Sequence, residues 1–224
     1  MRIVQTFVSA LSLLLLCTVV QAAPQAGKDY LAINPAQPTD TGNKVEVVEV
    51  FSYMCPHCHE FEPKVAAWVK QLPADTQFRR MPVVFGRASW EMLARTYYAL
   101  EAIGEIERIH PKIFAAIHED NVILQQKDVL FDWIEKQGVD RKKFSSAYDS
   151  FSMGGKIQRS TQRAQSYGIN GVPSIVVDGK YMVSTAQAGN YENMLKVVDE
   201  LVKQVRATKK AAAGKPQLPK TAKN

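Results

Sequence analysis

The segment VEVVEVFSYMCPHCHEF, residues 45–61, contains the change of pattern that decides the fold. Its first half is an apolar run rich in β-branched residues, as in strands, and after Cys58 the apolar residues recur every three or four positions. That helical stripe consists of Phe61, Val65, Trp68, Val69 and Leu72. A strand therefore ends where a helix begins. Pro56 suits the first helical turn because its missing N–H would have no partner there, which places Cys55 at the N-cap.

Two cysteines at this spacing lie close enough to bridge, and Cys55 is the one that faces outward. Its thiolate would lie at the positive end of the helix dipole, near the free N–H groups of the first turn. The dipole supplies roughly 0.3–1 kcal/mol, whereas each pKa unit costs about 1.4 kcal/mol. A shift of several units therefore needs backbone hydrogen bonds and help from His57, the cationic candidate inside the loop. A purely structural disulfide is the alternative, but so short a loop constrains little of the unfolded chain.

An acidic Cys55 has a directional consequence. Whatever stabilises its thiolate stabilises the reduced dithiol against the disulfide, and an acidic thiol also leaves readily when another thiolate attacks. The sequence therefore predicts a site that hands its disulfide on to other thiols.

These residues resemble the DsbA family of periplasmic thiol oxidases, within the thioredoxin superfamily. The resemblance rests on residues 49–58, on Phe61 and Glu62, on Gly171-Val172-Pro173 and on residues 176–181. It implies an α/β thioredoxin fold with an inserted all-helical subdomain. It also implies activity as a dithiol oxidase that needs no bound cofactor and no metal.

The resemblance assigns roles at the site. Cys55 and Cys58 would form the redox disulfide, with Cys58 as the buried resolving partner. Pro173 would follow a cis peptide bond beside the cysteines and leave the Val172 backbone free to pair with an extended substrate. Glu49 would lie buried beneath the site and assist proton movement; the alternative is a glutamate at a strand margin in an ion pair.

We expect five segments along the chain. Residues 1–22 read as a secretory signal peptide cleaved after Ala22, whose apolar run is too short for a membrane span, and Cys17 leaves with it. Residues 27–87 and 166–206 are the two parts of the thioredoxin domain, and residues 88–165 are the helical insert. Residues 207–224 read as a disordered basic tail. The resulting expectation is a periplasmic protein with two cysteines in an oxidising compartment.

The first part of the predicted domain contains three strands. An edge strand is expected at residues 30–33, a central strand covered on both faces at residues 45–53, and a further strand at residues 76–84. Two acids interrupt the central strand, and its alternation places Glu46 on one face and Glu49 on the other. In the second part, Pro173 opens a strand at residues 172–177, and Asp178-Gly179 turns the chain into the next strand.

The insert shows helical spacing with predicted breaks at Gly104, at residues 119–121, at Gly138 and at Gly154-Gly155. Asp140 is a candidate N-cap. The aromatic residues of the insert are expected in its core, and His110 and His118 are expected on the surface.

Other classes of function fit parts of the sequence. Cys55-Pro56-His57-Cys58-His59 is also a Cys-x-x-Cys-His string, the attachment signature of c-type haem with His59 as axial ligand. The motif here follows a strand, however, whereas c-type cytochromes are mainly helical around the haem. A zinc site would lack a second ligand cluster. A disulfide isomerase or reductase would use the same cysteines at another potential, and a non-redox binding module would use only the apolar surface near Pro173.

Charge and length restrict the partners. The 224 residues carry 28 Lys and Arg against 22 Asp and Glu, but Arg2 and the tail lysines account for most of the excess. The body is close to neutral, so the basic balance does not point to nucleic acid. The few residues before Lys44 leave no room for a dimerisation domain, which favours a monomer. The expected partners are reduced exported proteins and, by resemblance, a quinone-linked membrane oxidase like DsbB.

Overall fold

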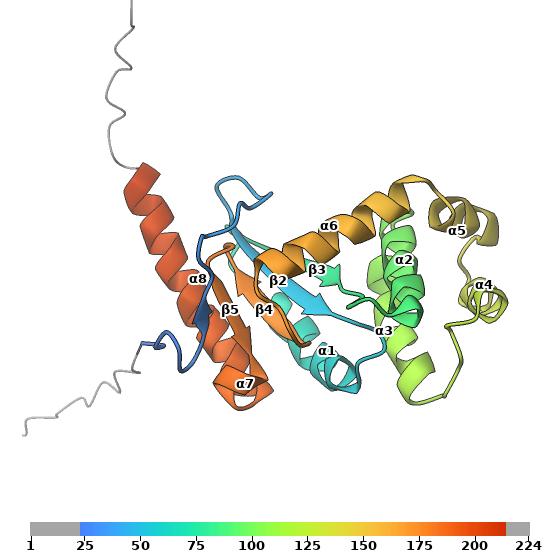
Figure 1. Cartoon of the computed structure of the whole chain (residues 1–224), viewed down its shortest axis with the longest axis horizontal. Helices are drawn as coiled ribbons and strands as arrows, with labels where there is room; N and C mark the ends of the chain where they lie inside the picture. The colour runs from blue at the N-terminus through green and yellow to red at the C-terminus, as the bar shows by residue number, and fades with distance from the viewer. Residues whose placement is uncertain (1–22, 214–224) are drawn as a thin grey trace, which may run out of the picture.

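The computed structural model describes residues 23–213, which form a five-stranded mixed sheet with helices on both faces (Figure 1). The predicted signal peptide and residues 214–224 lie outside the described residues. The strands are β1 (Leu31–Ala32), β2 (Val45–Phe51), β3 (Thr76–Pro82), β4 (Ser174–Val177) and β5 (Tyr181–Ser184). Their order across the sheet is β1-β5-β4-β2-β3; β2 runs parallel to β3, and the other pairs are antiparallel. β2 is therefore an interior strand, paired on both sides, and β1 lies at an edge, as the sequence predicts.

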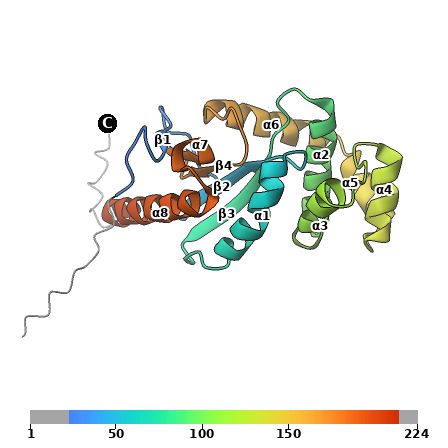
Figure 2. The ribbon, with the colours of Figure 1, turned by 90° about the horizontal axis from the view of Figure 1, so that it is seen from below.

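Helices cover the two faces unequally. Figure 2 shows α1 (Pro56–Val69) and α8 (Tyr191–Ala213) on one side of the sheet and α6 (Ser152–Ser166) on the other. Between β3 and α6 the chain forms α2 (Ala88–Ala102), α3 (Ile106–His118), α4 (Lys127–Lys136) and α5 (Arg141–Tyr148). A short α7 (Thr185–Ala188) precedes α8. A thioredoxin-type sheet with a helical insertion is confirmed. Among residues 23–213, no helix combines the length and apolar composition that crossing a bilayer requires.

The alternation of β2 sorts its side chains between these layers. Val45 and Val47 pack in a cluster with residues of α1 and α8, whereas Val48 and Val50 pack with the end of α6. The two acids follow the same alternation, and both are buried, so the predicted burial of this strand on both faces is confirmed.

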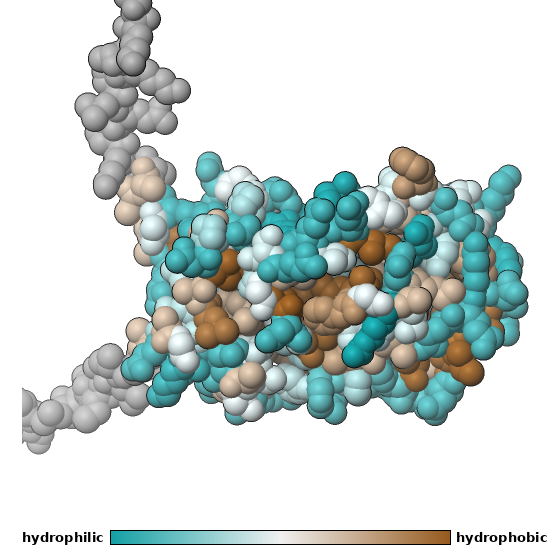
Figure 3. Space-filling model, in the orientation of Figure 1, coloured by the Kyte–Doolittle hydropathy of each residue, from teal (hydrophilic) through white to brown (hydrophobic). Residues whose placement is uncertain are grey.

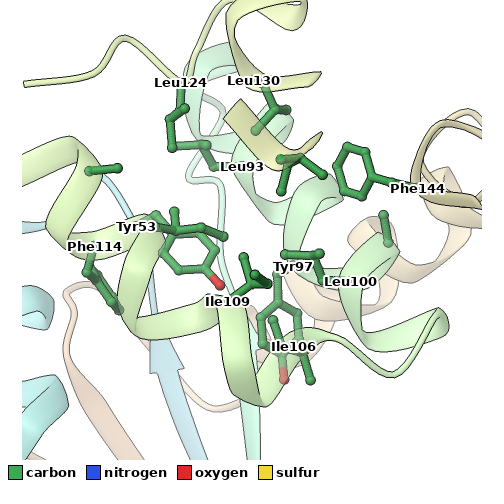
Figure 4. Close-up of a cluster of buried hydrophobic side chains, with 14 of the residues drawn as sticks. Tyr53, Leu93, Tyr97, Leu100, Ile106, Ile109, Phe114, Leu124, Leu130 and Phe144 are labelled. Carbon is green, nitrogen blue, oxygen red and sulfur yellow. The ribbon is translucent and has the colours of Figure 1, made fainter. Parts of the chain in front are cut away.

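The core of the insert reaches the end of β2. Its buried cluster contains Leu93, Leu100, Ile109 and Phe144 from four positions of the insert, together with Tyr53 from the β2–α1 connection (Figure 4). Both cysteines belong to the same cluster. The insert and the start of α1 therefore share one hydrophobic core.

Local signals at two turns are confirmed. The Asp140 side chain accepts a hydrogen bond from the Lys143 N–H at 2.9 Å, which caps α5. Asp178 and Gly179 both have positive φ, 52° and 63°, as the tight turn between β4 and β5 requires.

Three expectations were wrong at their boundaries. The third strand ends at Pro82 and not at Val84. The Gly154-Gly155 pair lies inside α6, and the chain breaks at residues 149–151 instead. Residues 207–213 are helical and not disordered, because the Lys209 ammonium contacts the Lys44 carbonyl at 2.7 Å and the buried Asp178 at 2.6 Å.

Candidate active site

Cys55 caps the start of α1, where the strand-to-helix pattern predicted it. Its backbone is extended, with φ −94° and ψ 114°, and Pro56 is the first helical residue. The N–H groups of Cys58 and His59 donate to the Cys55 carbonyl at 3.0 and 3.2 Å. Cys55 is 8% exposed and Cys58 is fully buried, and both are thiols in this structure. The more accessible sulfur is thus the one at the helix N-terminus.

The two thiols have opposite proton affinities. A hydrogen bond from the Cys58 thiol lowers the pKa of Cys55 to about 6, helped by the backbone N–H groups of Cys58 and His57 and opposed by burial. Burial, followed by the hydrogen bond to Cys55 and the negative charges of Cys55 and Glu49, raises the pKa of Cys58 far above its usual value. Near neutral pH, the reduced pair therefore holds a thiolate on Cys55 and a proton on Cys58.

His57 lies on the solvent side of this pair. Its side chain is 69% exposed, with Nδ1 3.6 Å from Glu60 Oε2. Tyr191 of α8 fixes the loop by donating its hydroxyl to the His57 carbonyl at 3.1 Å. The His57 charge is the smallest of the favourable influences on the Cys55 pKa, behind the hydrogen bonds.

The loop before β4 lies directly against Cys55. The Val172–Pro173 peptide bond is cis, and the Cys55 sulfur lies 3.4 Å from the Val172 carbonyl oxygen, to which it donates only when protonated. The Ser174 hydroxyl donates to the Gly171 carbonyl at 2.8 Å and ties the loop to the start of the strand. The structure thus brings Val172 and Pro173 to the reactive sulfur across 117 residues of sequence.

Apolar surface lies beside this loop. A groove of about 140 Å³ runs between the segment after β3 and the C-terminal half of α6, lined by Val83, Val84, Phe85, Gly86, Thr161, Ala164, Gln165 and Ile169. Figure 3 shows apolar surface gathered below α6 on the face seen in Figure 1, surrounded by hydrophilic residues.

Glu49 lies beneath the cysteines in a buried ion cluster. Its carboxylate accepts from Arg80 Nε at 3.1 Å, and the same guanidinium donates to both oxygens of Glu62 at 3.1 and 3.2 Å. Glu49 is 1% exposed, and burial raises its pKa to about 7 against the attraction of Arg80. Glu49 is therefore buried, as the resemblance implies, and ion-paired, as the alternative expects, but it lies inside β2 and not at a strand margin.

Sequence reasoning missed the other members of this cluster. His110, expected on the surface, is 1% exposed; its Nε2 lies 3.2 Å from Glu62, and its Nδ1 lies 2.7 Å from the Tyr53 hydroxyl. His118 is half-buried, and its Nε2 lies 2.8 Å from the Tyr53 carbonyl. The position of His110, four residues after Ile106 and four before Phe114 on an apolar stripe, was the available signal.

The arrangement does not suit haem attachment. Cys58 has no exposed surface in the shared core, so a porphyrin could not reach its sulfur, and His59 Nε2 lies 3.2 Å from Glu119. Within the described part of the chain, no group of three or more His, Cys, Asp or Glu could hold a metal ion.

Known proteins are similar to this chain in sequence and in fold. The DSBA-like thioredoxin domain family matches residues 46–196. The thiol:disulfide interchange protein DsbA of Bordetella parapertussis is 42% identical over 206 residues, covering 90% of this chain and 98% of that protein. The protein of the same name from Pseudomonas aeruginosa is 38% identical over 185 residues, 83% of this chain and 87% of that protein.

Solved structures of DsbA proteins have the same fold as this chain. The crystal structure of Pseudomonas aeruginosa DsbA matches with a TM-score of 0.80 at 37% identity, covering 84% of this chain and 97% of that chain. The oxidoreductase DsbA from Xylella fastidiosa matches with a TM-score of 0.77 at 34% identity, covering 83% and 100%. The chain therefore belongs to the DsbA family of thiol:disulfide oxidoreductases.

Proposed function

We propose that this dithiol oxidase donates a Cys55–Cys58 disulfide to reduced proteins exported to the periplasm. The observation that carries the proposal is the asymmetry of the pair, with an accessible Cys55 whose pKa is lowered to about 6 and a sealed Cys58 whose pKa is raised. A stabilised thiolate favours the reduced enzyme, and therefore makes its disulfide a strong oxidant.

The first chemical step opens the enzyme disulfide. A substrate thiolate attacks the Cys55 sulfur, the Cys55–Cys58 bond breaks, and Cys58 leaves with the electron pair. Because its pKa is raised, Cys58 takes up a proton. Glu49, with a pKa of about 7, is a buried group that can supply this proton near neutral pH.

The second step releases the product. A second substrate thiolate attacks the substrate sulfur of the mixed disulfide, and Cys55 leaves as a thiolate, which its lowered pKa stabilises. Two electrons have then passed from the substrate to the enzyme. His57 and the first-turn N–H groups stabilise the leaving thiolate, Pro56 holds that turn, and Val172 and Pro173 present the substrate chain beside Cys55.

The setting of the reaction is also part of the proposal. The signal-like residues 1–22 support export to the periplasm, where fractionation of cells producing the full chain would find the mature protein. Membership of the DsbA family supports re-oxidation by a quinone-linked, DsbB-like membrane enzyme, with the protein acting as a monomer. Reduced protein should regain its disulfide with such membranes and quinone, and should elute at the size of one chain.

The test is the reduction potential of the Cys55–Cys58 pair in glutathione buffers, followed by thiol trapping. The reduction potential of thioredoxin is about −270 mV, and we expect that of the Cys55–Cys58 pair to be well above it. A thioredoxin-like value would instead identify a reductase. Cys55→Ser should abolish oxidation of a reduced, unfolded substrate; oxidation that persisted in that variant would overturn the proposal.

A further inference from the structure

A hydrogen-bonded chain links the helical insert to the acid beneath the cysteines. The Tyr53 hydroxyl bonds His110 of α3, His110 bonds Glu62 of α1, Arg80 of β3 bonds Glu62, and the same Arg80 bonds Glu49 of β2. All five side chains are at most 9% exposed. Four separate elements therefore meet in one polar cluster inside the protein.

The charges of this cluster do not balance. One guanidinium faces two carboxylates, and burial lowers the pKa of His110, so the imidazole is neutral near pH 7. The cluster thus carries one excess negative charge and can hold one further proton. The groups that face His110 or its partners from the packed elements are Tyr53, Glu62, Arg80, Tyr97 and, from its own helix, Glu107.

The hydrogen bonds fix the tautomer of His110. The Glu62 carboxylate also binds Arg80 and can only accept, so Nε2 of His110 must carry the hydrogen. Nδ1 then has a free lone pair and accepts from the Tyr53 hydroxyl at 2.7 Å. The Tyr53 hydroxyl therefore holds His110 in the tautomer that donates to Glu62.

We infer that His110 is a positioning residue for disulfide exchange. Its Nε2–H donates to Glu62 and, together with Arg80, keeps the Glu62 carboxylate ionised. The exchangeable proton of the cluster therefore resides on Glu49. This inference rests on the proposed role of Glu49 as proton partner of Cys58. Without the His110 donor, Glu62 competes for the proton, and Glu49 loses proton affinity.

The proton on Glu49 can be followed directly. Carboxyl-carbon NMR of glutamate-labelled protein, with the Glu49 signal assigned by Glu49→Gln, gives its titration midpoint in the reduced full chain. In His110→Phe, which preserves an aromatic ring beside Phe51 and Phe114, we expect this midpoint to fall by about one pH unit, a tenfold loss of proton affinity.

Three further variants separate positioning from packing. His110→Gln retains a donor toward Glu62 and should restore most of the midpoint. Tyr53→Phe should lower it in the same direction as His110→Phe but by less. Tyr97→Phe is the matched control, since this buried phenol packs on His110 with its ring and makes no side-chain hydrogen bond among the described residues, and it should leave the midpoint unchanged.

The outcomes are distinct. An unchanged midpoint in both His110→Phe and Tyr53→Phe overturns the inference, as does a shift in Tyr97→Phe equal to that in Tyr53→Phe. If His110→Phe does not fold, Tyr53→Phe and His110→Gln decide. If the midpoint shifts as expected while oxidation rates at pH 6–8 stay the same, His110 does hold the proton on Glu49, but the proposed role of Glu49 in disulfide exchange fails, and with it the link from His110 to the exchange.

Discussion

Two buried acids on the two faces of β2 have opposite surroundings. Glu46 accepts from Arg163 at 2.6 Å and lies 3.7 Å from Arg79, and with Asp40 nearby this region pairs two cations with two acids. On the other face, Glu49 shares a single guanidinium, that of Arg80, with Glu62. Both acids are fully enclosed. The balanced cluster around Glu46 stabilises the fold. The cluster around Glu49 is short of one positive charge, and Glu49 can therefore gain or lose a proton near neutral pH.

The difference lies in the number of cations and not in burial. β2 contributes an acid to each face, and β3 contributes Arg79 and Arg80 to the same two faces. The extra cation on the Glu46 side comes from Arg163 of α6, and the extra acid on the Glu49 side comes from Glu62 of α1. The helix that covers each face thus decides whether the buried acid of β2 lies in a balanced cluster or in a cluster short of one cation.

The largest effect should follow from removing the single guanidinium of the unbalanced cluster. Arg80→Met leaves two buried carboxylates without a cation, so the free energy of unfolding at pH 8 should fall by about 3–5 kcal/mol. The loss should shrink toward pH 5 as the carboxylates take up protons. Urea denaturation of the reduced protein measures it. Arg79→Met is the control: Arg79 is 44% exposed and Arg163 remains, so the cost should stay below about 1 kcal/mol.

Glu49→Gln should remove a pH dependence of stability. The folded pKa of about 7 lies above the ordinary value of 4.5, so the folded protein binds more protons than the unfolded chain between these values. Unfolding free energy therefore falls as pH rises from about 4.5 to 7, by at most about 3 kcal/mol. The difference between wild type and Glu49→Gln, measured by denaturation at each pH, should follow this slope; a flat difference would contradict it.

Glu46→Gln should act differently at the balanced cluster. It leaves Arg163 and Arg79 without their buried carboxylate, so unfolding free energy should fall by about 1–3 kcal/mol. The oxidase rate, measured on a reduced, unfolded substrate, should be unaffected. A fall in that rate would show that the two faces are not distinct.

The smallest effect should come from Asp40 at the exposed margin of the balanced cluster. Its side chain is 62% exposed, so Asp40→Asn should cost less than about 1 kcal/mol. The hydrogen bond from Arg163 lowers the pKa of Asp40, so its contribution is present above the ordinary pKa of 3.8 and is lost as pH falls below it. Thermal unfolding at pH 7 and at pH 3 should show a larger difference from wild type at the higher pH.

Local pattern predicted the framework of the site because that framework is local. The change from strand to helix period placed Cys55 at the N-cap, and alternation along β2 put Glu46 and Glu49 on opposite faces. The polar cluster was out of reach because its members meet only in the folded protein: Arg80 lies 31 residues from Glu49, and His110 lies 48 from Glu62.

The errors have physical reasons. The sequence predicts a surface position for His110 and His118, but hydrogen bonds satisfy both ring nitrogens of His110 in the core, and His118 is half-buried. The start of the lysine-rich tail was expected to be disordered from its composition, and Lys209 anchors it through contacts that composition does not encode.

The hydrophobic cluster that joins the cysteines to the insert has a consequence for protein engineering. The insert is continuous in sequence between β3 and β4 and so resembles an exchangeable cassette. Excising the insert would expose Phe51 and Tyr53 to water. It would also remove His110, the hydrogen-bond partner of Glu62. Grafts between relatives should therefore exchange α1, β3 and the insert together. These elements meet in the shared core and its polar cluster, so they form one structural unit that extends beyond the insert itself.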